Sequence, residues 1–135
     1  MNLAFIIIDD SELDCFIAKK IIQQNDKSTK VATFTDAISA LRQINDNTDM
    51  HSNLLTIILL DLRLPIMSGF EFVEEFERLP VNVRSKYVIY VLSSSMNKND
   101  KSRVDSNENI IKMLDKPLTK TSFDVIMSEV GARKI

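Results

Sequence analysis

The sequence is poor in cysteine, tryptophan, proline and glycine, and these shortages exclude several classes of protein. A single cysteine, Cys15, excludes an internal disulfide and a metal site built from several cysteines. With three prolines and two glycines, the 135 residues contain no Pro-rich or Gly-rich linker, and no repeat or low-complexity tract divides them. We therefore expect one domain over residues 1–135, with no second domain.

The chain also lacks an excess of charge and any long apolar run. Its 17 Lys and Arg residues against 19 Asp and Glu residues give a net charge of −2, and no basic stripe is visible. Nucleic acid is therefore not an expected partner. The longest apolar runs have five or six residues, too short to cross a bilayer, and the N-terminus lacks the features of a signal peptide. We expect a cytoplasmic protein that does not insert into membranes.

The sequence does contain a regular alternation of short apolar runs and segments of helical period. The runs predict strands at residues 3–8, 31–34, 54–60, 87–92 and 110–114. Several runs are apolar at consecutive positions, which indicates strands buried on both faces, as in a parallel sheet covered by helices.

The segments between these runs repeat apolar residues at helical spacing. Ser11 followed by Asp14 resembles a capping box with Asp in place of Glu, and Cys15 lies off the apolar stripe of this first helix. Thr35 is a candidate cap for the second helix, and Pro80 ends the third. The four apolar faces are Leu13, Phe16, Ile17 and Ile21; Ala37, Leu41 and Ile44; Phe72, Val73, Phe76 and Leu79; and Phe123, Ile126, Met127 and Val130.

Residues 96–109 are an exception to this pattern. Val104 is their only apolar residue between Met96 and Ile110, so we expect a short helix with little to bury. Strands and helices otherwise alternate along the whole chain. This order predicts the α/β class, with a doubly wound parallel sheet.

Polar residues with a possible chemical role follow the first, third, fourth and fifth predicted strands. The carboxyl ends of parallel strands share one edge, where ligands bind in open α/β sheets. Carboxylates that converge there repel each other, and a divalent cation with oxygen ligands, such as Mg²⁺, relieves the repulsion. A lysine, a serine hydroxyl and an aspartate nucleophile beside such a cation predict phosphoryl transfer onto the aspartate. The residues at the strand ends are Asp9 and Asp10, Asp61, Ser93 to Ser95, and Asp115 to Pro117.

Four motifs in register carry a resemblance to a known family. They are IIIDD at 6–10, LLDLRLPIMSG at 59–69, VLSS at 91–94 and DKP at 115–117. In this order and spacing the chain resembles a response-regulator receiver domain of the single-domain type, over essentially its whole length. The resemblance implies a flavodoxin-like fold, in which helices cover both faces of a five-stranded parallel sheet of order 2-1-3-4-5.

The resemblance also assigns roles to the residues at the strand ends. It implies that Asp61 is the phospho-acceptor and that Ser93 and Lys116 contact the phosphoryl group. It implies Mg²⁺ or Mn²⁺ held by Asp10, Asp61 and the backbone carbonyl of Arg63, with Asp9 acting through water. The Lys116–Pro117 peptide is expected to be cis. Pro65 and Gly69 are expected to shape the loop after Asp61.

Three positions depart from the family pattern or leave it open. Met113 stands where the family often has an aromatic switch residue, so an aromatic toggle with Ser93 is in doubt. The resemblance links Arg63 and Ser95 to the rate of dephosphorylation, and we expect Arg63 to change water access or charge near the phosphoryl group.

The implied function is that of a stand-alone phosphorylation switch. The donor would be a sensor histidine kinase or a histidine phosphotransfer protein. Phosphorylation would reshape a face over residues 96–130, for an unknown downstream protein or for onward phosphotransfer. The alternatives are a degenerate receiver that binds proteins without phosphorylation and an aspartate-nucleophile phosphatase. A phosphatase of the haloacid-dehalogenase type would need Asp-x-Asp after its first strand, and a flavodoxin-like cofactor binder would need a phosphate loop there in place of IIIDDSELD.

Overall fold

The computed structural model describes residues 3–27, 29–46, 54–94 and 97–133. Five parallel strands form one sheet of order β2-β1-β3-β4-β5, as the resemblance implied. The predicted strand ranges agree with the observed ones within one residue at each end. The strands are β1 (Leu3–Ile8), β2 (Lys30–Phe34), β3 (Leu55–Leu60), β4 (Tyr87–Ser93) and β5 (Ile110–Asp115).

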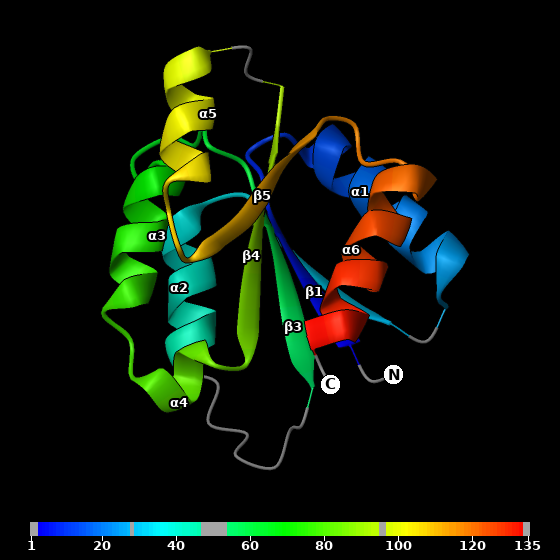
Figure 1. Cartoon of the computed structure of the whole chain (residues 1–135), viewed down its shortest axis with the longest axis horizontal. Helices are drawn as coiled ribbons and strands as arrows, with labels where there is room; N and C mark the ends of the chain where they lie inside the picture. The colour runs from blue at the N-terminus through cyan, green and yellow to red at the C-terminus, as the bar shows by residue number, and fades with distance from the viewer. Residues whose placement is uncertain (1–2, 28, 47–53, 95–96, 134–135) are drawn as a thin grey trace.

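Helices cover both faces of this sheet (Figure 1). Helices α1 (Glu12–Asn25) and α6 (Lys120–Arg133) lie on one face, over a core that includes Phe5, Ile7 and Phe123. The other face packs under α2 (Ala37–Asp46), α3 (Gly69–Glu77) and α5 (Lys98–Asp105). A short helix, α4 (Val81–Arg84), follows α3 and was not predicted. No helix in the described ranges is long and apolar enough to cross a membrane.

The apolar face predicted for α1 is wrong at two of its four residues, whereas Ile21 packs against the core as predicted. Leu13 and Phe16 are 66% and 61% exposed, whereas Cys15, Ala18 and Ile22 are buried against the sheet. The side of α1 that carries Cys15, Ala18 and Ile22 therefore faces the sheet, and Leu13 and Phe16 face solvent. The prediction that Cys15 lies off the core-facing stripe is therefore also wrong.

The N-terminus of α2 differs from the prediction as well. The Oδ1 atom of Asp36, not the Thr35 hydroxyl, accepts from the backbone N–H of Ser39 at 2.7 Å. The Ser39 hydroxyl donates to Oδ2 of the same carboxylate at 2.9 Å. Asp36 is therefore the residue that satisfies the free N–H at this helix end.

A β-bulge in β5 decides which way Met113 faces. Ile89 pairs with Ile110, but Val91 pairs with Met113, so β5 has one residue more than β4 between these pairs. An extra residue reverses the alternation of side chains beyond it. Ile110 and Met113 consequently both pack on the side of α2, α3 and α5.

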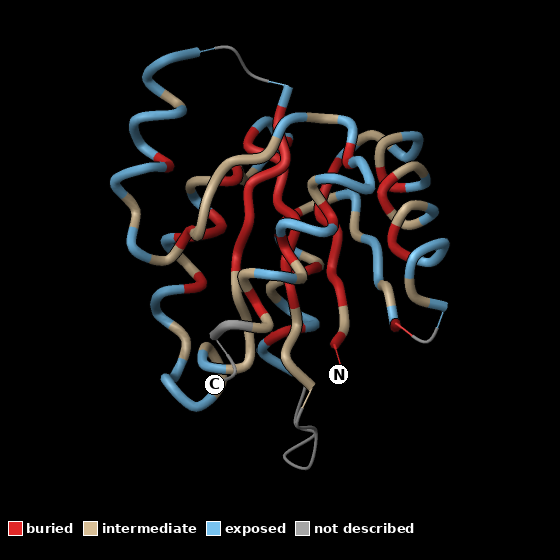
Figure 2. The backbone as a smooth tube through the Cα atoms, turned by 45° about the vertical axis from the view of Figure 1, so that its right-hand side comes forward, coloured by how far each residue is buried: buried red, intermediate tan, exposed pale blue. Residues whose placement is uncertain are grey.

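Helix α5 is the least buried of the long helices, as its composition predicted (Figure 2). Val104 is its only buried residue. Two cationic contacts connect it to its neighbours: the Arg103 guanidinium lies 3.7 Å from the centre of the Phe70 ring, and Asp100 pairs with Arg63. With so little apolar burial, α5 is attached mainly by polar groups.

Candidate functional site

The site lies at the carboxyl edge of the sheet, beyond the ends of β1 and β3. The backbone N–H of Asp9 donates to the carbonyl of Phe34 at 3.0 Å, and that of Asp61 donates to the carbonyl of Ile8 at 2.9 Å. These bonds continue the sheet for one residue and fix both acids beside β1. Asp9 and Asp61 are 2% and 6% exposed, while Asp10 faces solvent. Carboxylate oxygens of the three residues lie within 4.8 Å of one another.

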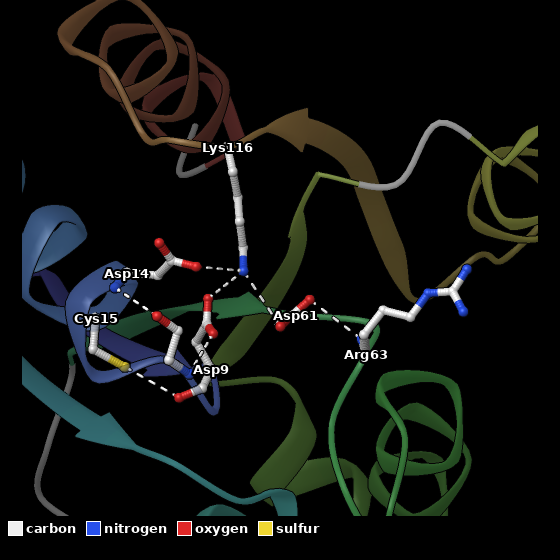
Figure 3. Close-up of polar contacts among 7 residues, drawn as sticks. Asp9, Asp14, Cys15, Asp61, Arg63 and Lys116 are labelled. Atoms are coloured by element: carbon white, nitrogen blue, oxygen red, sulfur yellow. Dashed lines mark hydrogen bonds and ion pairs between the residues drawn. The ribbon is translucent and has the colours of Figure 1, made fainter.

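The ammonium group of Lys116 lies among these acids (Figure 3). Its Nζ atom is 2.6 Å from Oδ2 of Asp9 and 3.3 Å from Oδ2 of Asp61. A third carboxylate, that of Asp14 in the first turn of α1, accepts from Nζ at 3.0 Å. The Lys116 side chain is 12% exposed, so these contacts are shielded from water.

Burial and charge act in opposite directions on the acids and the lysine. Burial raises the pKa of Asp61, while the Arg63 N–H, which donates to Oδ1 at 3.2 Å, and the nearby Lys116 charge lower it; the net direction is up. For Lys116, burial lowers the pKa, but the hydrogen bonds to Asp9 and Asp14, together with the charges of Asp61 and Asp9, raise it by more. The lysine therefore stays charged at neutral pH and offsets part of the carboxylate repulsion.

The end of β5 holds Lys116 at this edge. Its backbone N–H donates to the carbonyl of Ser93 at 3.1 Å, and Ser93 itself is 2% exposed. The Lys116–Pro117 peptide is cis, the isomer that the resemblance implied. Leu118, which is 2% exposed, packs into the core under α1 and α6 and anchors the chain after the turn. Ser93 at the end of β4 and Lys116 just after β5 thus lie beside each other at this edge.

The loop after Asp61 is tightly folded. The Met67 N–H donates to the carbonyl of Pro65 at 2.7 Å, across Ile66, which has a φ of 68° and is 89% exposed. Gly69 then begins α3 against the end of β3: an added Cβ would lie 2.6 Å from the carbonyl oxygen of Asp61. Glycine is needed here because two stretches of backbone approach closely.

The Arg63 side chain does not point toward the acids. Its guanidinium extends away from Asp61 (Figure 3) and pairs with Asp100 of α5 at 2.9 Å. Its backbone N–H nevertheless bonds Oδ1 of Asp61. Arg63 therefore connects the acceptor loop to α5. Sequence reasoning missed both Asp100 and this connection, because the partners are 37 residues apart.

Asp14 was also missed as a site residue. The sequence suggested only a helix cap, since it lies three residues after Ser11. A usable signal was present, because the first turn of α1 begins two residues after Asp10 and so starts at the site. Ser95, which the resemblance linked to dephosphorylation, lies outside the described residues.

The donor set suits a hard divalent cation. Asp9, Asp10 and Asp61 supply only carboxylate oxygens, and Asp10 is open to solvent for water ligands. Mg²⁺ is commonly held by one or two carboxylates, and it keeps several waters. No sulfur or imidazole ligand joins the group in the described part of the chain. The Cys15 thiol lies nearby, 3.3 Å from the Asp9 carbonyl oxygen, but burial, with the surrounding acids, raises its pKa to about 11.

Comparisons with known proteins agree with this geometry. Residues 5–127 match the family described as response regulator receiver domain. A response regulator receiver protein from Dyadobacter fermentans is 31% identical, with 94% of this chain and 96% of that chain covered and a TM-score of 0.83. A two-component response regulator from Cytophaga hutchinsonii is 21% identical, with 96% and 98% covered and a TM-score of 0.85.

A chemotaxis response regulator of Vibrio cholerae shares the fold at 20% identity and a TM-score of 0.74, with 96% of this chain and 99% of that chain covered. No curated protein matches the chain. The family match, the strand order and the grouped acids agree, and the chain belongs to the response regulator receiver domain family.

Proposed function

We propose that this domain accepts a phosphoryl group on Asp61 and switches a protein-binding face in response. The single observation that carries the proposal is the grouping of Asp61 with Asp9 and Asp10, with the Lys116 ammonium in contact with Asp9 and Asp61. An exposed loop acid would need no such surroundings. A carboxylate that must attack phosphorus needs an adjacent positive charge to offset the charge that gathers in the transition state.

The proposed donor is a phosphohistidine on a kinase or phosphotransfer protein. A carboxylate oxygen of Asp61 attacks phosphorus, and a P–O bond forms as the P–N bond breaks. The imidazole nitrogen leaves with the electron pair of that bond. Lys116 then exchanges its long contact with Asp61 for a phosphoryl oxygen, and the Ser93 hydroxyl donates to another.

The fit of the acids to a divalent cation gives each of them a role. Asp10, Asp61 and the Arg63 carbonyl would hold Mg²⁺ or Mn²⁺ directly, and Asp9 would act through water. When bound, the cation neutralises charge and aligns the transferring group. Asp9 also positions Lys116, through its 2.6 Å contact with Nζ.

The output is proposed to pass through α5 and β5, toward residues 96–130. Arg63 contacts Asp61 through its backbone and α5 through its side chain. A shift of the loop after Asp61 would therefore move the partner of Asp100 in α5. Met113 packs on the same side, where its flexible side chain can follow a movement of Ser93. Helix α5, with one buried residue, costs little to displace.

Acetyl phosphate with Mg²⁺, read by intact mass, tests the proposal. Wild type is expected to gain one phosphoryl group that hydroxylamine removes, as it removes acyl phosphates. Asp61→Asn is expected to gain none. Asp46→Asn is the matched control, because Asp46 is an exposed aspartate at the end of α2, and it is expected to behave as wild type. A folded wild type without the adduct, or an adduct retained in Asp61→Asn, contradicts the proposal.

The same assay separates the alternatives. A degenerate receiver would give no adduct but would still bind its partner. A phosphatase would hydrolyse a phosphate monoester over many turnovers. The buried lysine and acids argue against the first alternative. The adjacent Asp9 and Asp10, in place of Asp-x-Asp, argue against the second.

A further inference from the structure

The carboxylate of Asp14 is not used by the helix end on which it lies. Ser11 caps α1, and its hydroxyl accepts from the Asp14 backbone N–H at 3.2 Å. In a complete capping box the acid would accept in return from the N–H of the cap residue. Here that N–H, on Ser11, donates to Oδ1 of Asp9 at 2.9 Å. The cap is thus satisfied without the Asp14 side chain, which accepts from Lys116 at 3.0 Å.

The contact with Asp14 completes the surroundings of the lysine. An ammonium group has three N–H donors, and Lys116 has three carboxylate neighbours, one each from Asp9, Asp14 and Asp61. Two of these neighbours are nearly buried, with side chains 4% and 8% exposed. Asp14 is 35% exposed, so water can solvate it when the contact breaks.

We propose that Asp14 is a positioning residue that holds the Lys116 ammonium and sets how strongly the site prefers a cation to a phosphoryl group. The inference rests on the proposed function of the site. Asp14 adds a fourth negative charge to those that Asp9, Asp10 and Asp61 bring to the site. That charge attracts a divalent cation and repels a phosphoryl anion. It also keeps Lys116 partly engaged, so the lysine must share its donors between Asp14 and the phosphoryl oxygens.

The negative charge of Asp14 should favour Mg²⁺ binding and disfavour the phosphoryl adduct, so its removal should change the two in opposite directions. Asp14→Asn keeps the shape and the backbone N–H that Ser11 accepts from, so the helix cap stays intact. Loss of the charge is expected to weaken Mg²⁺ binding about three- to tenfold, the order expected when one nearby unit charge is removed from a partly solvated site. At saturating Mg²⁺, the phosphoryl adduct is expected to form faster and to last longer. A merely structural residue would change neither ligand selectively.

The matched control is Glu71→Gln in α3. Glu71 is the acid of a similar Ser-x-x-acid motif, but its carboxylate accepts from the Ser68 N–H at 3.0 Å and completes its box. Glu71→Gln is expected to leave Mg²⁺ binding and the formation and lifetime of the phosphoryl adduct unchanged. Magnesium affinity is measured by calorimetry on the unphosphorylated protein. Lys116 is followed by the ¹⁵N–¹H signal of its ammonium, which is visible only while hydrogen bonds slow its exchange with water.

Asp14→Ala is the second variant and removes the contact altogether. The proposal predicts that the Lys116 ammonium signal persists in Glu71→Gln and is lost in Asp14→Ala. An unchanged signal in Asp14→Ala, or a magnesium affinity in Asp14→Asn equal to that of wild type, overturns it. If wild type itself is not phosphorylated, the proposed function fails. The ammonium and magnesium measurements then still decide the role of Asp14.

Discussion

Helices α1 and α3 both begin at the functional edge of the sheet with a serine cap and an acid three residues after it. The acids of the two motifs bind different partners. In α3, Ser68 and Glu71 bond each other's backbone N–H at 3.2 and 3.0 Å, and the box is closed. In α1, Ser11 caps the helix, but its own N–H goes to Asp9 and the acid goes to Lys116.

The difference has two physical causes. Aspartate is one methylene shorter than glutamate, so it reaches back to the cap residue less easily. The strand end before α1 also supplies a second carboxylate, Asp9, which takes the N–H that the box would use. A local motif therefore fixes where a helix starts, while tertiary neighbours decide what its polar side chains bind.

The largest expected effect on stability comes from Gly69→Ala, which changes the first residue of α3. The new Cβ would lie 2.6 Å from the Asp61 carbonyl oxygen and 2.8 Å from Cα of Leu62. Both atoms belong to the backbone and cannot rotate away, so overpacking should cost about 2–3 kcal/mol of unfolding free energy. Urea denaturation of wild type and Gly69→Ala measures this loss of unfolding free energy.

The control for this loss is Ser68→Ala, which removes only the cap of α3. Gly69→Ala should also slow phosphorylation of Asp61, because the clash displaces the acceptor's own carbonyl. A Gly69→Ala protein as stable as Ser68→Ala would show that α3 can move away from β3 freely.

A smaller effect on stability is expected when the serine cap of α1 or of α3 is removed. Ser11→Ala and Ser68→Ala should each lower the free energy of unfolding by about 1 kcal/mol, the usual cost of removing a serine cap. Ser11→Ala alone should weaken magnesium binding, because the Ser11 hydroxyl fixes the Asp14 backbone. Calorimetry with Mg²⁺ on both variants checks this. Equal magnesium affinities would mean that the α1 cap does not orient Asp14.

Much of the fold could be predicted from the sequence, because β1, β3 and β4 are largely apolar on consecutive positions. Burial on both faces leaves such segments few alternatives. The orientation of α1 could not be predicted in this way. Side-chain periodicity favoured Leu13 and Phe16, but Cys15, Ala18 and Ile22 face the sheet. Hydrophobicity ranks large side chains first, so a face that includes Cys15 and Ala18 gave a weaker signal.

The candidate site was predictable where its residues end strands, as with Asp61 and Lys116. Its connections to helices were not, because they depend on tertiary placement. The pairing of Arg63 with Asp100 joins the loop after β3 to α5, which is remote in sequence. The bulge in β5 that turns Met113 toward α5 left no signal in a run of apolar residues.

The smallest expected effect on stability is at the N-terminus of α2, where Asp36 caps the helix. The Ser39 N–H holds the pKa of Asp36 below its ordinary value, so the folded state favours the charged carboxylate. The stabilisation is present above the unfolded-state pKa, about 4, and is lost as pH falls through the lower folded-state value. Asp36→Ala should therefore cost about 0.5–1 kcal/mol at pH 7 and progressively less below pH 4, as urea midpoints at each pH will measure. Asp46→Ala, at the opposite end of α2, removes a carboxylate from the negative end of the helix dipole and should give no such loss. An Asp36→Ala cost that stayed constant down to pH 3 would mean that the carboxylate charge contributes nothing to the cap.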